Sequence, residues 1–198
     1  MIRFEDEQEA NEEENEKPKK SMMDRLLETR TITIFGEIDM KLAQEIVEKL
    51  MLLAADSDDD IKIFINSPGG HVESGDTIFD MIRFVKPTVK VVGTGWVASA
   101  GALIYSATDR ENRYSLPNTR FLLHQPMGGV RGQAQDIAIE AEEILKMRER
   151  LNRIFAEQTG QPLEKVTKDT DRNFWMSAEE AVEYGLVGQI IGSADEID

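Results

Sequence analysis

Ser99 is the residue whose type and surroundings are best suited to chemistry. It lies in the run GTGWVASAG, residues 93–101, between a strand pattern at Val89–Val92 and a helical pattern at Ala102–Tyr105. A serine at a strand-to-helix junction presents its hydroxyl to a substrate, and the N–H groups that follow lie at the positive end of the helix, where an oxyanion is stabilised. The chain contains no cysteine, so a thiol nucleophile is excluded.

A serine nucleophile needs a base, and the chain has only two histidines, His71 and His124. His124 follows the apolar residues 121–123, where a strand leaves the core, whereas His71 opens a helix directly after Ser67-Pro68-Gly69-Gly70. We expect this SPGG run to be a strand-end turn whose glycine N–H groups face an oxyanion. Each feature alone is more often structural, but together they predict an acyl-transfer site.

Composition narrows the class of protein. The chain has 198 residues, enough for one domain with a full core, and its net charge of −15 argues against nucleic acid and anionic membranes as partners. No apolar run approaches the roughly 20 residues of a membrane span, and the N-terminus shows no apolar signal-peptide region. Together with the absence of cysteine, this predicts a cytoplasmic protein.

The acidity is concentrated at the N-terminus. Residues 1–16 carry eight acidic side chains and one basic one, and residues 17–20 read KPKK. So charged a segment buries too little apolar surface to fold alone. We therefore predict a disordered acidic arm at residues 1–20 and a single folded domain at residues 21–198.

Strand and helix patterns alternate through this domain. The expected strands are Thr31–Phe35, Ile61–Ile65 and Val89–Val92, and the intervening helices start at Asp39 and run over Val72–Val85. Two short strands are expected further on, near residues 113–115 and 120–124. Such alternation predicts an α/β fold made of βαβ units with a largely parallel sheet.

A long helix pattern covers Ile137–Phe155 and extends from about Gln133 to Gln158, roughly 40 Å at the rise of an α-helix. The glycine-containing segment Gly128–Gly132 precedes it. A helix this long projects from a small domain, which favours an oligomer contact. The alternative is a solvated amphipathic helix packed on its own domain.

Seven stretches, taken together and in order, resemble the Clp protease proteolytic subunits, the ClpP family, from about residue 22 to residue 191. They are INSPGG (65–70), ASAGA (98–102), LPNTR (116–120), HQPMGG (124–129), GQA (132–134), TGQPLE (159–164) and MSAEEA (176–181).

The resemblance implies a serine peptidase on a ClpP/crotonase-like α/β spiral, with the long helix as a projecting handle. It implies Ser99 as nucleophile, His124 as base, and the N–H groups of Gly70 and Ala100 as oxyanion hole, with no metal and no cofactor. It also implies two stacked heptameric rings, a tetradecamer that encloses the active sites and degrades unfolded polypeptides delivered by an AAA+ unfoldase ATPase.

The chain departs from the family at the third triad position. The family run ends in aspartate, but here it reads Asp169-Thr170-Asp171-Arg172-Asn173, so Asn173 stands at the triad site. An asparagine oxygen accepts the imidazole N–H bond but supplies no negative charge. Asp171 is a possible substitute, about 6–7 Å away if the segment is extended. Trp96 also replaces a smaller residue, which reshapes the substrate pocket.

Three functions remain open at this point. The leading hypothesis is a Clp-type serine endopeptidase with a Ser99–His124–Asn173 triad and low or conditional activity. The second is an inactive structural or regulatory subunit that co-assembles with an active ClpP paralogue. The third, an acyl-CoA hydratase-like crotonase relative, needs no serine–histidine pair.

Overall fold

The computed structural model describes residues 20–129 and 131–197 of the chain. The predicted acidic arm, apart from Lys20, lies outside the described residues, so the division at residues 20 and 21 stays a prediction. The elements, in chain order, are α1 (Met22–Glu28), β1 (Thr31–Ile38), α2 (Met40–Asp56), β2 (Ile61–Gly70), α3 (Val72–Phe84), β3 (Val89–Ala98), α4 (Ala100–Tyr105), η1 (Arg110–Asn112), β4 (Arg113–Ser115), β5 (Arg120–Leu123), α5 (Ala134–Thr159), α6 (Leu163–Asp169), β6 (Phe174–Met176), α7 (Ala178–Tyr184), β7 (Gln189–Ile190) and η2 (Ala194–Glu196).

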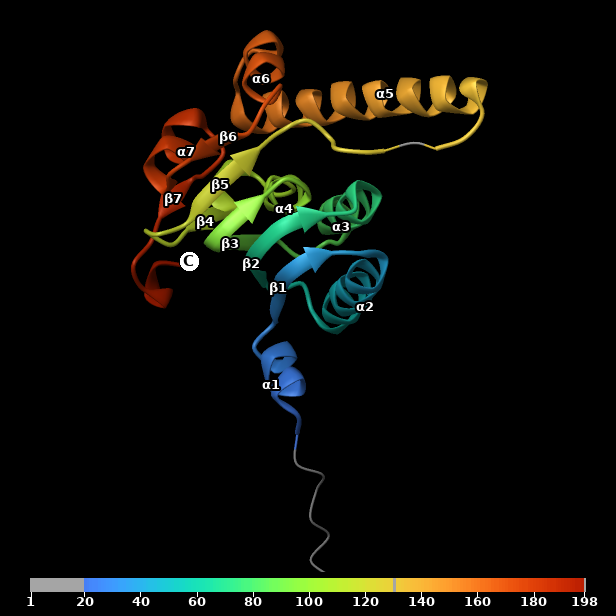
Figure 1. Ribbon diagram of the computed structural model, residues 1–198. Helices are drawn as coiled ribbons and strands as arrows, with labels where there is room; N and C mark the ends of the chain where they lie inside the picture. Colours follow the sequence, from blue (N-terminus) through green and yellow to red (C-terminus); the bar gives the residue numbers. More distant parts are fainter. Residues whose placement is uncertain (1–19, 130, 198) are drawn as a thin grey trace, which may run out of the picture.

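The predicted α/β fold with a parallel sheet is confirmed. The main sheet has the order β1-β2-β3-β4-β7, and all of these neighbours pair in parallel (Figure 1). Strand β3 divides between two partners: its first half pairs with β4, and its last residues pair with β5. Strand β6 then adds antiparallel to β5. Because of this division, β5 and β6 lie outside the main strand order and form a branch of the sheet that starts at the end of β3.

Helices α2, α3 and α4 cover one face of the sheet (Figure 1). Asp39 caps α2 by accepting a hydrogen bond from the Leu42 amide at 2.7 Å, as its residue type favours. The buried residues of α2 are Ala43, Ile46, Leu50 and Leu53, which recur at helical spacing and pack on the apolar side chains of the strands.

One expected element boundary was wrong, and one short helix was not predicted. The SPGG run is not a turn beyond the strand, because β2 continues through it to Gly70, paired with Ile38 of β1. A change of register between Ile65 and Ser67 absorbs the irregular backbone of this run. Helix α1 was also not predicted; Ser21 and Asp24 form a capping box at its start.

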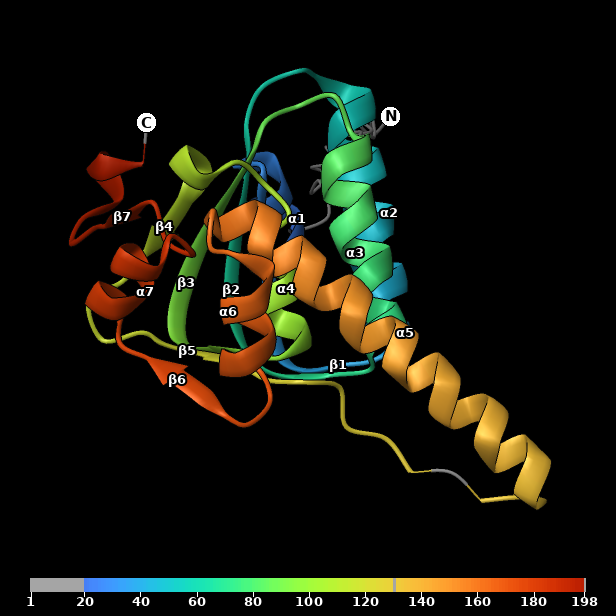
Figure 2. The ribbon, with the colours of Figure 1, turned by 90° about the horizontal axis from the view of Figure 1, so that it is seen from above.

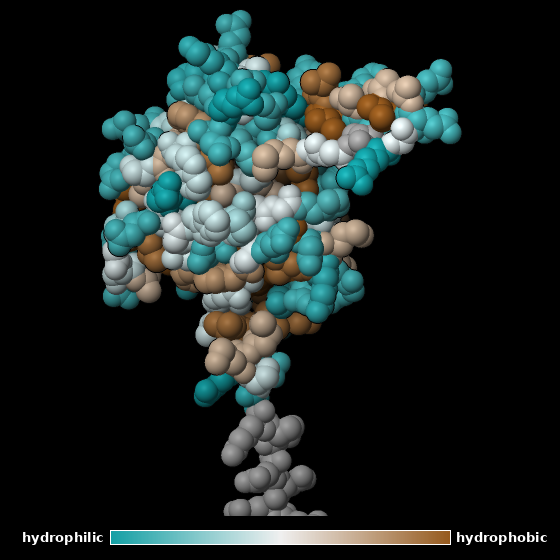
Figure 3. All heavy atoms as spheres, viewed as in Figure 1, coloured by the Kyte–Doolittle hydropathy of each residue, from teal (hydrophilic) through white to brown (hydrophobic). Residues whose placement is uncertain are grey.

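Helix α5 projects from the body of the molecule (Figures 1 and 2). Its 26 residues span about 39 Å, and its buried residues begin only at Leu151. Three large apolar side chains of its free half are exposed, Ile137, Ile139 and Leu145, and apolar surface is visible at the projecting end in Figure 3. None of the helices described is long and apolar enough to cross a membrane.

Candidate active site

Ser99 lies between the end of β3 and the start of α4, as the sequence predicts. Its backbone has φ 55° and ψ −121°, a conformation that is uncommon for a residue with a side chain. The amide of Ser99 donates to the carbonyl of Leu122 in β5 at 2.9 Å. Strain of this kind at a strand-to-helix turn is typical of an exposed nucleophile.

The glycines of β2 meet this turn at close range. A methyl group built on Gly69 would lie 2.6 Å from Ser99 Cβ and 3.2 Å from the Ala100 amide nitrogen. At Gly70 it would lie 2.2 Å from the carbonyl oxygen of Ile38. Only glycine fits at either position, where φ is +97° and +151°. The β2 end therefore packs directly on the Ser99 backbone, and Ala100, as first residue of α4, has an N–H without an intrahelical partner.

His124, the residue directly after β5, shares a cavity with Ser99. The other lining residues are apolar and come from α3, α4, α5 and the segment after β5: Val72, Ala100, Leu103, Pro126, Leu151 and Phe155. The cavity has a volume of about 10 Å³, so its walls nearly touch. Among the residues that the structure describes, no hydrogen bond joins Ser99 Oγ to the imidazole. Ser99 and His124 thus line one cavity without a hydrogen bond between them.

The pairing of β5 with β6 brings Asn173 to His124. Phe121, Leu122 and Leu123 lie opposite Met176, Trp175 and Phe174, and one further antiparallel step sets His124 opposite Asn173. Burial lowers the pKa of His124 below its usual 6.5, while the neighbouring Asn173 side chain acts in the opposite direction. Both residues also line a cavity of about 430 Å³. His124 therefore shares one cavity with Ser99 and another with Asn173.

Asp171 also lines the cavity that His124 shares with Asn173, but its carboxylate is paired with another element. It lies in a turn after α6 rather than in an extended segment, and its carboxylate pairs with Arg148 of α5 at 2.9 Å. Its carbonyl oxygen accepts a hydrogen bond from the Gln125 side chain at 2.6 Å. Asp171, the acidic residue nearest to Asn173 in the sequence, thus forms an ion pair with α5.

The rival histidine, His71, is engaged within its own helix. Its Nδ1 lies 2.9 Å from Ser74 Oγ, and its Nε2 lies 3.2 Å from a carboxylate oxygen of Glu73. It lines neither the cavity of Ser99 nor the cavity of Asn173. Geometry therefore favours His124 as the partner of Ser99.

The sequence analysis missed the apolar wall of the Ser99 cavity. Leu151 and Phe155 are one helical turn apart on α5, within the helix pattern predicted over Ile137–Phe155. Their spacing shows that they share a face, but not that Ser99 lies opposite them. Arg150 anchors the same helix to α3 through two hydrogen bonds of 2.6 Å to the Asp76 carboxylate.

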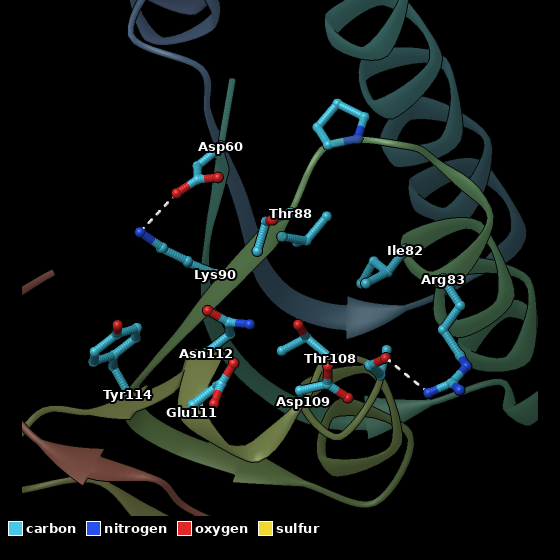
Figure 4. A pocket seen from close by; sticks show the side chains of 13 residues that line it. Asp60, Ile82, Arg83, Thr88, Lys90, Thr108, Asp109, Glu111, Asn112 and Tyr114 are labelled. Atoms are coloured by element: carbon cyan, nitrogen blue, oxygen red, sulfur yellow. Dashed lines mark hydrogen bonds and ion pairs between the residues drawn. The ribbon is translucent and has the colours of Figure 1, made fainter. Parts of the chain in front are cut away.

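A larger cavity, of about 700 Å³, lies at the other end of the strands (Figure 4). It is lined by residues from the start of β3, the end of α3 and the segment between α4 and β4, and an ion pair of 2.7 Å joins Lys90 to Asp60 at its edge. It contains no histidine and no serine. Within residues 20–129 and 131–197, no group of three or more His, Asp or Glu side chains is arranged to hold a metal ion.

Comparisons with known proteins agree on one family. The family model described as Clp protease matches residues 13–194. An ATP-dependent Clp protease proteolytic subunit 3 from Rhizobium etli is 63% identical over 172 residues, which cover 87% of this chain and 89% of that protein. The solved structure of ClpP1 from Listeria monocytogenes is 56% identical, covers 90% of this chain and 100% of its own, and has a TM-score of 0.81. An asparagine-to-aspartate mutant of the same ClpP1 has a TM-score of 0.84, with the same identity and coverage.

Proposed function

Because the chain belongs to the Clp protease family, a family of serine peptidases, we propose that it is a proteolytic subunit with Ser99 as nucleophile, His124 as base and Asn173 in place of the usual aspartate. Its substrates are unfolded polypeptides, and its activity is low or conditional. The oxyanion is held by the N–H groups of Gly70 and Ala100. The protein acts in the cytoplasm.

One observation carries this proposal: His124 lines a common cavity with Ser99 and lies beside Asn173 at the paired ends of β5 and β6. In the proposed reaction Ser99 Oγ attacks the carbonyl carbon of the scissile peptide bond and His124 takes the hydroxyl proton. The same imidazole then gives this proton to the leaving amine, and water hydrolyses the acyl-enzyme by the reverse steps.

Asn173 makes the first step slow. Its amide oxygen accepts the imidazole N–H and so orients His124, but a neutral group does not stabilise the imidazolium that forms. Loss of the corresponding charge in a trypsin-type triad costs about 10⁴ in kcat. The Asp171 carboxylate is paired with Arg148, so it is a poor substitute for the missing triad aspartate.

A second function is favoured by the absence, among the described residues, of a hydrogen bond between Ser99 and His124. In this alternative the chain is an inactive structural or regulatory subunit that co-assembles with an active ClpP paralogue. The deciding experiment assays turnover of a fluorogenic peptide and of unfolded casein by the purified protein, alone and mixed with an active ClpP. Labelling of Ser99 by a fluorophosphonate in either sample supports the peptidase, and no labelling in both supports the inactive subunit.

We further propose that the chain assembles into two stacked heptameric rings that an AAA+ unfoldase ATPase supplies with substrate. The projecting α5, with its exposed apolar side chains, supports a contact between rings. The relatives are named as subunits of ATP-dependent proteases, which supports an ATPase partner. The mutant ClpP1 of the Listeria relative keeps the same fold, so an asparagine-to-aspartate exchange is tolerated there.

Replacing Ile139 with glutamate is expected to break the proposed ring contact. Ile139 is 59% exposed on the free half of α5, and a charge at a buried apolar contact is destabilising by several kcal/mol. Sedimentation velocity should show single rings or smaller species. The control is Gln135→Glu, which adds the same charge to the same helix without removing an apolar side chain; an unchanged large particle for Ile139→Glu contradicts the contact.

The pH dependence of Ser99 labelling follows from the environment of His124. Burial lowers the pKa of this imidazole below 6.5, and only the neutral form accepts a proton. The labelling rate should therefore rise with pH through a midpoint below 6.5 and stay constant above it. In Asn173→Asp the carboxylate favours the imidazolium, so the midpoint should move to higher pH by about 1 unit or more. A shift in the opposite direction contradicts contact between the two residues.

A further inference from the structure

Three side chains gather on the face of β3, β5 and β6 that is turned away from the core. The rings of Trp96 and Trp175 are nearly parallel, with an interplanar angle of 4° and centroids 6.4 Å apart. The guanidinium carbon of Arg120 lies 4.2 Å from the centroid of the Trp175 ring. Trp96 is the register partner of Arg120 on β5. We call these three residues the Trp–Arg cluster.

The cluster faces water. Trp96 is 43% exposed, Arg120 is exposed and Trp175 is half-buried. The residue that follows each of them along its strand is instead buried in the core: Val97, Phe121 and Met176. Strand alternation therefore keeps the whole cluster on the outer face, with aromatic surface open to a ligand.

The charge of Arg120 is unmatched. Other arginines of this acidic chain pair with carboxylates, for example Arg148 with Asp171 and Arg150 with Asp76. In the described part of the chain, Arg120 has neither an ion pair nor a side-chain hydrogen bond. The guanidinium lies over the Trp175 ring, and its N–H groups have no partner among the described residues. A planar, preorganised fork of donors is suited to a carboxylate.

The cluster lies on the same face as the proposed catalytic residues. Alternation along β5 puts Arg120, Leu122 and the following His124 on one side, and along β6 it does the same for Trp175 and Asn173. Leu122 accepts the hydrogen bond from the Ser99 amide. Arg120 precedes Leu122 by two residues, about 7 Å along the strand. An extended polypeptide covers this distance in two to three residues.

We propose that the Trp–Arg cluster is a subsite for a carboxylate of the polypeptide substrate, two to three residues from the bond cleaved at Ser99. Arg120 binds the carboxylate, and the indole rings cover the apolar part of the same region of the substrate. The position of the subsite relative to the cleaved bond rests on the proposed function, but binding does not require catalysis. The carboxylate belongs either to an aspartate or glutamate side chain or to the C-terminus of the polypeptide.

The two tryptophans of the chain are both in the cluster, so tryptophan emission reports on it directly. The full chain carrying Ser99→Ala is titrated with three otherwise identical extended peptides. One has an internal glutamate and a C-terminal amide, one has glutamine and a free C-terminal carboxylate, and one has glutamine and a C-terminal amide. We expect at least one carboxylate peptide to bind about fivefold more tightly than the neutral peptide, as one preorganised and partly exposed charge pair allows.

Arg120→Gln should abolish this preference, and Arg120→Lys, which keeps the charge without the planar fork, should reduce it. Arg25→Gln, on the remote helix α1, is the matched control and should preserve it. The proposal is overturned if the neutral peptide binds equally well, or if the preference survives Arg120→Gln. Fluorophosphonate labelling of the chain with Ser99 intact is measured separately, alone and mixed with an active ClpP: a carboxylate preference without Ser99 labelling in either sample refutes the proposed function alone, and labelling without a preference refutes the subsite alone.

Discussion

Ser99→Ala is expected to reduce peptide turnover and fluorophosphonate labelling to the uncatalysed background. The hydroxyl oxygen is the atom that bonds to the substrate carbonyl, and loss of the nucleophile in a serine protease triad costs about 10⁶ in kcat. The measurement is initial-rate hydrolysis of a fluorogenic peptide by the variant alone, together with gel detection of labelling of this chain in the presence and absence of an active ClpP. Circular dichroism confirms that the variant is folded.

The two histidines provide the comparison for this variant. His124→Ala should resemble Ser99→Ala, because the base is lost. His71→Ala should be much milder, because His71 contacts Ser74 and Glu73 and lines neither cavity of the proposed site. Full labelling in Ser99→Ala, or equal loss in His71→Ala and His124→Ala, would refute the assignment.

Asn173→Asp is expected to raise turnover by at least about tenfold, within a ceiling near 10⁴ set by trypsin-type triads. The exchange replaces an amide by a carboxylate of almost the same shape beside His124, so the fold should survive. The restored charge stabilises the imidazolium that forms during attack and favours the tautomer that leaves the other nitrogen free to accept the Ser99 proton. The measurement is kcat/KM for a short peptide.

The competing explanation is that alignment, rather than charge, limits the reaction. The Ser99 cavity is nearly closed and Ser99 is not hydrogen-bonded to His124 among the described contacts. In that case Asn173→Asp alone leaves turnover near zero, whereas an active ClpP raises Ser99 labelling without any substitution. Both forms are therefore assayed with and without the partner. If neither change produces a reaction at Ser99, the chain is an inactive subunit.

Local signals in the sequence determined much of the fold. Asp39 and Ser177 begin α2 and α7 because each side chain accepts a bond from an amide of the first turn. Gly185 ends α7 because it adopts a left-handed conformation that other residues resist. The long α5 follows from its apolar spacing and from ion pairs one turn apart, Glu142 with Lys146 and Glu149 with Arg153. All of these interactions span no more than a few residues.

Tertiary structure alone decided what surrounds Ser99. The pairing of His124 with Asn173 depends on the antiparallel register of β5 and β6, and β6 has only three residues, too few to carry a readable period. The Asp171 carboxylate is held by Arg148, 23 residues away, and Trp96 meets Trp175 across 79 positions of sequence. The division of β3 between β4 and β5 likewise has no local signal. Strand partners and their register are set by the burial of apolar faces throughout the domain. The sequence therefore identifies a serine and a histidine as candidates for catalysis, while tertiary packing determines which side chains surround them.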